Sequence, residues 1–161
     1  MRSEKATAKL TVAALQYCAA GTPDETMKMV MPLLDMAVDG GAQLICLPEA
    51  ASFLASGRLA LSDTAEWEDA SPTLCRFCEL AAAKAIDIHV GSIMMRRRLD
   101  SACVNRGYLI GADGAVSAQY DKIHMFDANV GDGRRYSESD NFATGSSLVW
   151  GDSNGLKLGL T

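Results

Sequence analysis

The sequence lacks any apolar run long enough to cross a bilayer, and its first residues, Met1 to Lys9, are polar with mixed charge. A membrane-spanning helix needs about 20 consecutive apolar residues and a secretory signal needs an apolar core, so neither is predicted. Repeats, low-complexity tracts and linkers are also absent from the sequence. The 161 residues, 48% hydrophobic and 22% charged, are therefore expected to form one packed domain.

Positive charge is scarce, because 15 Lys and Arg stand against 20 Asp and Glu and the formal net charge is -5. Binding to a nucleic-acid backbone needs clustered Lys and Arg, which displace counterions from the phosphates. Arg96-Arg97-Arg98 is a local exception, and its place between two apolar segments indicates a solvated loop. We therefore expect neither a nucleic acid nor a membrane as a partner.

The chain has five cysteines: Cys18, Cys46, Cys75, Cys78 and Cys103. This odd number without a secretory signal argues against a disulfide framework and favours free thiols in the cytoplasm. The Cys75-Arg76-Phe77-Cys78 spacing allows a redox-active pair or half of a zinc site, but the sequence has no second pair. The favoured interpretation is two helical residues with Cys78 facing the core, and a redox or metal-binding protein is the lowest-ranked alternative.

Two segments have the apolar spacing of amphipathic helices. The first carries Met27, Val30, Met31, Leu34 and Val38 and ends at Gly40-Gly41. Because Pro32 lies within this pattern, we expect a kinked helix or one that starts later. The second helix starts at Ser71-Pro72, a cap followed by a first-turn proline. Its apolar face is expected to hold Leu74, Phe77, Cys78, Ala81 and Ala85.

Strands are predicted from short apolar runs bounded by turn residues: 10–15, 43–48, 86–93, 104–110, 115–120, 147–150 and 156–161. The first two flank the first helix and form a strand-helix-strand unit. The last four form two hairpins, with turns at 111–114 and 152–155. This mixture predicts an α/β (α+β) fold with layered architecture and a mixed sheet.

Residues 121–146 show no periodicity, and a loop of that length in a compact domain is typical of a functional segment. Glu138 lies within it, while Glu49 follows the strand 43–48 and Lys122 follows the strand 115–120. Taken singly, each of these three residues is best explained as an ordinary surface charge or cap.

Three stretches change this interpretation together: Leu47-Pro48-Glu49-Ala50, Tyr120-Asp121-Lys122-Ile123-His124-Met125-Phe126-Asp127 and Arg135-Tyr136-Ser137-Glu138-Ser139. In this order they resemble successive signatures of the nitrilase superfamily, and the likeness covers essentially the whole chain. The residues of the second and third stretches are most similar to those of the branch that contains omega-amidases and deaminated-glutathione amidases.

The resemblance implies an α-β-β-α sandwich and hydrolysis of a small linear amide to acid and ammonia, with no cofactor and no metal. It also implies roles: Glu49 as general base, Lys122 as the residue that stabilises the oxyanion, and Glu138 as a second glutamate that orients the lysine or the substrate. When complete, such proteins are expected to be homodimers or larger homo-oligomers.

In the family, the catalytic cysteine follows the strand that matches 156–161. We therefore expect residues 1–161 to be the N-terminal portion of a single carbon-nitrogen hydrolase domain, inactive without the part that follows. The five cysteines present are expected to be packing residues, and Cys46, three positions before Glu49 on a strand, is a poor nucleophile candidate. The alternative is a non-catalytic truncated remnant that binds a ligand or a partner.

Overall fold

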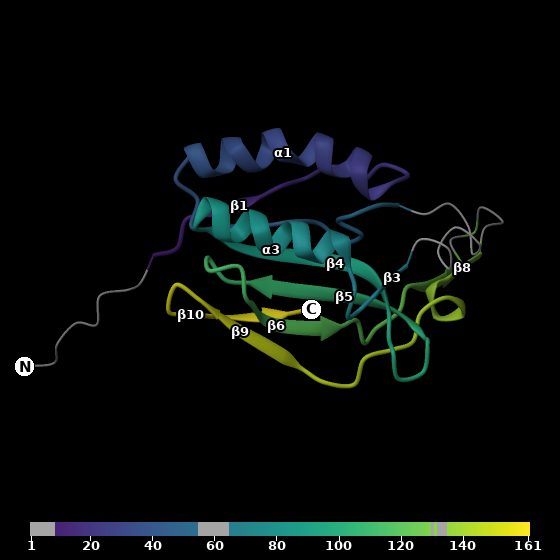
Figure 1. The fold of residues 1–161 in the computed structure, drawn as a ribbon. Coiled ribbons are helices and arrows are strands. Elements are labelled where there is room, and N and C mark those ends of the chain that lie inside the picture. Colours follow the sequence, from purple (N-terminus) through teal and green to yellow (C-terminus); the bar gives the residue numbers. More distant parts are fainter. Residues whose placement is uncertain (1–8, 55–64, 130, 132–134) are drawn as a thin grey trace, which may run out of the picture.

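The computed structural model describes residues 9–54, 65–129, 131 and 135–161. A mixed sheet lies between two helices on one face and a β-hairpin on the other (Figure 1). Within the described residues, neither helix has the length and apolar composition needed to cross a membrane.

The sheet has six strands and combines parallel with antiparallel pairing, as the sequence predicted. In spatial order its strands are β1 (Val12–Ala14), β2 (Leu44–Cys46), β4 (Asp87–Arg96), β5 (Cys103–Ile110) and β6 (Val116–Asp121). Strands β1, β2 and β4 are parallel, and β4, β5 and β6 are antiparallel. The sixth strand, β3 (Glu66–Trp67), was not predicted, because two residues that pair only with the far end of β4 leave no periodic pattern.

The helices are α1 (Pro23–Asp39) and α3 (Pro72–Lys84). Both begin with a cap: the Thr22 side chain accepts a hydrogen bond from the backbone N–H of Glu25, and Ser71 accepts one from Leu74. Helix α1 contains Pro32 in its interior, so the expectation of a later start is wrong. Ala85, which was assigned to the apolar face of the second helix, is instead its exposed C-terminal cap with φ 50°.

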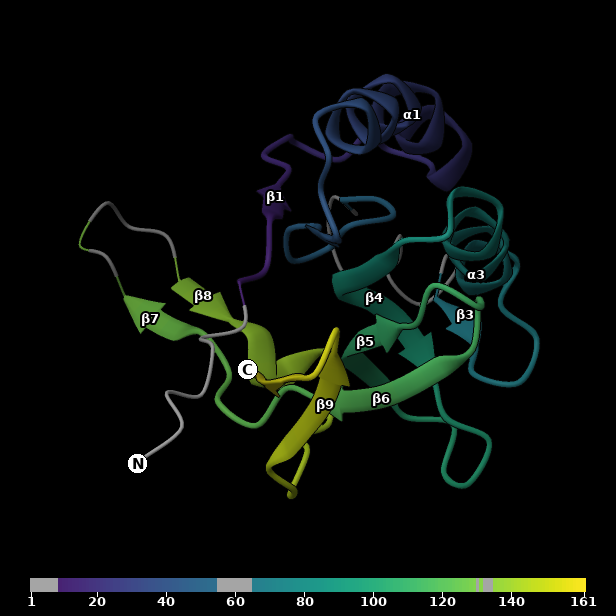
Figure 2. The ribbon, with the colours of Figure 1, turned by 90° about the vertical axis from the view of Figure 1, so that its left-hand side faces the viewer.

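The main core lies between the sheet and the two helices (Figure 2). Alternate residues of the central strands point into it, so that Ile45, Ile88 and Val90 are fully buried against Val30 of α1 and Phe77 of α3. The other face of the sheet carries a smaller cluster: Leu44, Leu109, Tyr120 and Leu160.

The hairpin of β9 (Val149–Ser153) and β10 (Leu156–Leu160) covers part of this second face. Its turn is made by Asn154 and Gly155, both with positive φ, as expected for an Asn-Gly hairpin. Figure 2 shows β9 beside β6, and Leu160 packs in the cluster of the second face. The hairpin therefore brings Leu160 onto this face and Thr161 beside Tyr120.

Residues 121–146 are not free of regular structure, and that expectation is wrong. Strands β7 (Asp127–Asn129) and β8 (Arg135–Ser137) form a short antiparallel pair, followed by the 3-10 turn η1 (Glu138–Asp140). These elements have few apolar residues and depend on pairing with each other, so hydrophobic periodicity could not predict them. Residues 130 and 132–134 of the segment lie outside the described residues, as do residues 1–8 of the polar N-terminal tail.

Candidate active site

Glu49 is held at the carboxyl end of β2 by hydrogen bonds to the neighbouring strand β4. The Leu47 N–H donates to the His89 carbonyl at 2.8 Å, and the Ala50 N–H donates to the buried Ser92 hydroxyl at 2.8 Å. Ala50 has a φ of 52°, which turns the chain sharply after Glu49. The backbone is therefore fixed on both sides of Glu49, while its side chain is 60% exposed.

Gly91 allows this segment to approach β4. A Cβ at Gly91 would lie 2.5 Å from the Pro48 carbonyl oxygen and would also overlap the Leu47 carbonyl oxygen. Only a residue without a side chain lets the backbone before Glu49 pass this close.

Lys122 follows the last residue of β6, and the register of the sheet sets it beside Asn105 of β5. Its N–H donates to the Asn105 carbonyl at 2.9 Å, and its own carbonyl accepts from the Gly145 N–H at 2.9 Å. The preceding pair in the ladder is Arg106 with Asp121, whose side chains are joined by an ion pair. The Lys122 side chain is 24% exposed.

Glu138 is the first residue of η1, directly after β8, and its carboxylate also reaches Lys122. Its N–H donates to the Phe126 carbonyl at 3.2 Å, and its Oε2 accepts from the Phe126 N–H at 2.7 Å. With a side chain only 15% exposed, Glu138 is the more buried of the two glutamates.

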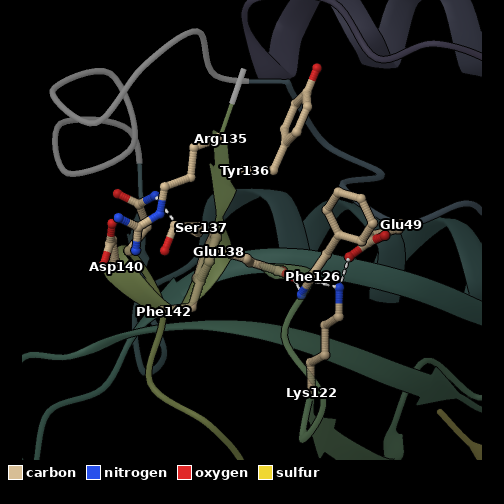
Figure 3. A pocket seen from close by; sticks show the side chains of 10 residues that line it. Glu49, Lys122, Phe126, Arg135, Tyr136, Ser137, Glu138, Asp140 and Phe142 are labelled. Carbon is tan, nitrogen blue, oxygen red and sulfur yellow. Dashed lines mark hydrogen bonds and ion pairs between the residues drawn. The ribbon is translucent and has the colours of Figure 1, made fainter. Parts of the chain in front are cut away.

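The three side chains meet in one hydrogen-bonded cluster (Figure 3). Lys122 Nζ lies 2.8 Å from Oε1 of Glu49 and 2.8 Å and 3.1 Å from the two carboxylate oxygens of Glu138. Asn105 joins the cluster, because its Nδ2 donates to Oε1 of Glu49 at 2.7 Å and to Oε1 of Glu138 at 3.2 Å. The structure thus brings together all three residues singled out in the sequence and adds a fourth.

The charges of this cluster support one another. Burial lowers the pKa of the Lys122 ammonium, but hydrogen bonds to Glu138 and Glu49 outweigh burial and raise it overall. Burial raises the pKa of the Glu138 carboxyl, but hydrogen bonds from Lys122, Phe126 and Asn105 prevail and lower it. At neutral pH, Lys122 is therefore a cation and Glu138 an anion.

Two cavities adjoin the Glu49–Lys122 pair. The larger, about 600 Å³, also contains Phe126, Tyr136 and Glu138, and its volume is in the range of small-molecule sites. The smaller, about 160 Å³, is lined on its other sides by Gly91, Ser92, Asn105, Gly107, Tyr120 and Thr161. None of the five cysteines, all of which lie within the described residues, lines either cavity.

The cysteines are free thiols, as expected. Cys46 packs with the apolar cluster of the second face, and burial raises the pKa of its thiol. Cys78 packs against the main core, whereas Cys75 is exposed. Burial, followed by the nearby Cys75 and Glu79, also raises the pKa of Cys78, which disfavours the thiolate that redox chemistry requires. In the described residues, no group of three or more His, Cys, Asp or Glu could hold a metal ion.

Asn105, Gly91 and Ser92 were missed in the sequence, although a signal was present. Each is a small or polar residue inside a strand that also carries several large apolar residues. Polar residues are mostly exposed, so a polar residue inside a buried strand is a stronger indication of a functional role than one on the surface.

The sequence and the fold were compared with those of known proteins. The carbon-nitrogen hydrolase family model matches residues 11–161. Deaminated glutathione amidase from Yersinia enterocolitica is 30% identical over 152 residues, which cover 93% of this chain and 52% of that protein. The chain thus spans about half the length of this curated relative.

Two solved structures share the fold. The NitFhit protein of C. elegans superposes with a TM-score of 0.77 at 20% identity, over 91% of this chain and 36% of that chain. A variant of the amidase from Nesterenkonia sp. AN1, in which acrylamide has added to the active-site cysteine, superposes with a TM-score of 0.75 at 17% identity, over 94% of this chain and 56% of that chain. The α/β fold expected from the sequence is confirmed, and the chain belongs to the carbon-nitrogen hydrolase family.

Proposed function

We propose that this chain carries the base and the oxyanion-binding residue of an amidase that hydrolyses a small linear amide to a carboxylic acid and ammonia. The observation that carries the proposal is the position of Lys122 Nζ, 2.8 Å from Glu49 and 2.8 Å from Glu138, at the edge of a cleft of about 600 Å³. A cation held between two carboxylates beside an open cleft is suited to acyl transfer.

The nucleophile in this proposal is a cysteine that follows Thr161 in the complete protein. Thr161 lines the smaller cavity together with Glu49 and Lys122, so a polypeptide that continues past Thr161 would enter the site beside these residues. The amidase of similar fold from Nesterenkonia sp. AN1 has an active-site cysteine. The family signature places Tyr-Asp or Tyr-Glu after that cysteine.

In the first step, Glu49 takes the thiol proton and the thiolate sulfur attacks the amide carbonyl carbon. The C=O π electrons move to oxygen and form a tetrahedral oxyanion. Lys122 Nζ donates to Oε1 of Glu49 and to both oxygens of Glu138. In this proposal, one of the two N–H groups directed at Glu138 turns to the oxyanion, and the positive charge acts there in a partly water-excluded site.

In the second step, Glu49 gives the proton to the departing nitrogen, the C–N bond breaks, and ammonia leaves. Glu49 then takes a proton from water as the water oxygen attacks the thioester carbon. The C–S bond breaks, Glu49 returns this proton to the sulfur, and the carboxylic acid and the thiol are released. Proton transfers by a positioned group contribute roughly 10²–10⁴-fold in rate. Glu138 remains ionised throughout and holds Lys122 in place.

The substrate belongs, in this proposal, to the small linear amides of the omega-amidase and deaminated-glutathione amidase branch. The relative from Yersinia enterocolitica, a deaminated glutathione amidase, supports this choice. The cleft offers a tilted pair of aromatic rings, Phe126 and Tyr136, with centroids 5.8 Å apart. These exposed rings are suited to contact the carbon chain of such a substrate.

The test is ammonia release from short omega-amides by the complete protein. Glu49→Gln and Lys122→Met should each lower the rate at least about 100-fold. Glu79→Gln, which neutralises an exposed glutamate of α3, is the matched control and should leave the rate unchanged. Full activity of both site variants would refute the assigned roles.

The 161-residue chain alone should release no ammonia. Glu49-dependent release by this chain would show that the nucleophile does not come from beyond Thr161. A complete protein that binds omega-amides but never turns them over would instead favour the non-catalytic alternative.

A further inference from the structure

Asn105 is a buried amide at the centre of the cluster. It is 5% exposed, on a strand whose other described positions are almost entirely buried. The two ends of the amide differ: Nδ2 contacts both glutamates, whereas Oδ1 is buried and has no hydrogen-bond partner among the residues that the structure describes. A buried acceptor without a donor is unfavourable, so the amide is not explained by its contribution to packing.

The orientation of this amide follows from its neighbours. Ionised carboxylates only accept hydrogen bonds, so the end of Asn105 that faces Glu49 and Glu138 must be the donating NH₂ group. Rotating the amide by 180° would set Oδ1 against two carboxylate oxygens. Each of the two N–H bonds therefore has its own carboxylate, at 2.7 Å and 3.2 Å.

The two glutamates differ in the hydrogen bonds that their carboxylate oxygens accept. Both oxygens of Glu138 accept two hydrogen bonds each, from Lys122, Asn105 and the Phe126 N–H. Glu49 accepts from Lys122 and Asn105 through Oε1 only, and within the described residues its Oε2 has no donor. An oxygen that already accepts two donors is the less basic one, so a proton taken by Glu49 goes to Oε2.

We propose that Asn105 is a positioning residue of this site, which ties Glu49 to Glu138 through its amide nitrogen and leaves Oε2 of Glu49 as the oxygen that takes and returns the proton. The catalytic part of this proposal rests on the proposed amidase function. The link between the two glutamates does not, and it can be tested on the 161-residue chain.

Two substitutions remove the NH₂ donors in different ways. Asn105→Asp keeps the shape of the side chain but introduces a third carboxylate, whereas Asn105→Leu keeps the number and branching of the heavy atoms and adds no charge. Asn129→Asp, on the exposed strand β7, is the matched control for the added charge. If Asn105→Asp does not fold, Asn105→Leu still reports the loss of the donors.

The first measurement is an NMR titration of the side-chain carboxyl of Glu138 in the 161-residue chain. The hydrogen bond from Asn105 contributes to the lowered pKa of Glu138, so both Asn105 variants should raise that pKa, the Asp variant more than the Leu variant. Asn129→Asp should leave it unchanged. An unaltered Glu138 titration in a folded Asn105→Leu variant would overturn the proposed link.

The second measurement is the pH dependence of kcat/KM for the complete amidase. Both Asn105 variants should lower kcat roughly 10- to 100-fold with little change in KM, as expected when a base is misplaced. The acid limb of the profile should move to higher pH, further for Asp than for Leu. An unchanged acid limb with a normal kcat would overturn the positioning role.

The outcomes separate the two proposals. If the Glu138 titration moves in the variants but the unsubstituted complete protein shows no amidase activity, the proposed function fails and the link through Asn105 stands. If the complete protein is active and the Asn105 variants retain its kcat and pH profile, the proposed function stands and the positioning role fails.

Discussion

Gly91→Ala should displace the backbone that carries Glu49. The added Cβ would lie 2.5 Å from the Pro48 carbonyl oxygen, and the two atoms must separate by at least about 0.5 Å to reach 3.0 Å, below which Cβ atoms are essentially never found. The Leu47 and Pro48 carbonyl oxygens that the new Cβ would meet are backbone atoms, so no flexible side chain can absorb the overlap. The segment before Glu49 must therefore move away from β4.

This movement has a calculable effect. Oε1 of Glu49 lies 2.7 Å from Asn105 Nδ2 and 2.8 Å from Lys122 Nζ, and a displacement of about 0.5–1 Å would weaken or break both hydrogen bonds. Overpacking of this kind costs about 1–3 kcal/mol of folding free energy. With a urea m-value of about 2 kcal/mol/M, the unfolding midpoint should fall by roughly 1 M.

Urea unfolding of the 161-residue chain, followed by circular dichroism, measures this loss, and the side-chain NH₂ resonances of Asn105 report on the cluster. Gly159→Ala is the matched control, because a Cβ at this strand glycine meets nothing within 4 Å. It should leave the midpoint unchanged or raise it slightly. Equal midpoints for the two variants, with unmoved Asn105 resonances, would refute the requirement for glycine at position 91.

Three further substitutions test other parts of the structure by the same unfolding assay. Ala85→Gly should stabilise the chain by about 0.5–1 kcal/mol, because Ala85 caps α3 with φ 50°; a loss of stability would contradict this. Arg106→Met should destabilise it by about 3 kcal/mol, because Arg106 is buried and bridges Glu68 and Asp121; a change below 1 kcal/mol would count against that bridge. Burial lowers the pKa of His89, so the unfolded state protonates first and stability should fall as the pH drops below about 6.5. His89→Leu should flatten this dependence, and an unchanged slope would assign it to other groups.

The elements predicted correctly from the sequence are those with local signals. Ser71-Pro72 begins a helix because the serine hydroxyl accepts a hydrogen bond from a free N–H at the helix start. Asn154-Gly155 forms a hairpin turn because both residues tolerate positive φ. Strands β3, β7 and β8 escaped prediction because they have two or three residues each and form only by pairing with a partner brought close by the rest of the fold.

The candidate site, too, has features that the sequence indicated and features that only the fold reveals. Glu49, Lys122 and Glu138 were singled out by family resemblance, since nothing in their spacing distinguishes them from ordinary surface charges. What brings them together is non-local: the antiparallel register of β5 and β6 sets Lys122 beside Asn105, and the β7–β8 pair returns the chain so that Glu138 reaches both. Such convergence depends on sheet topology, which apolar periodicity alone does not determine.

Because Glu138 and Glu49 differ in burial and in the hydrogen bonds they accept, replacing each by Gln should change stability to a different extent. The Glu138 side chain is 15% exposed and its pKa is lowered overall, so its contribution is fully present above the unfolded-state pKa and is lost as pH falls through the lower folded-state value. Glu138→Gln should thus lower the free energy of unfolding by about 1–3 kcal/mol at pH 7, with a smaller difference near pH 3. Glu49 is 60% exposed and accepts through one oxygen, so Glu49→Gln should have a smaller effect at both pH values. Unfolding titrations at the two pH values would measure this, and a larger loss for Glu49→Gln at pH 7 would mean that Glu49, and not Glu138, is the main anchor of Lys122.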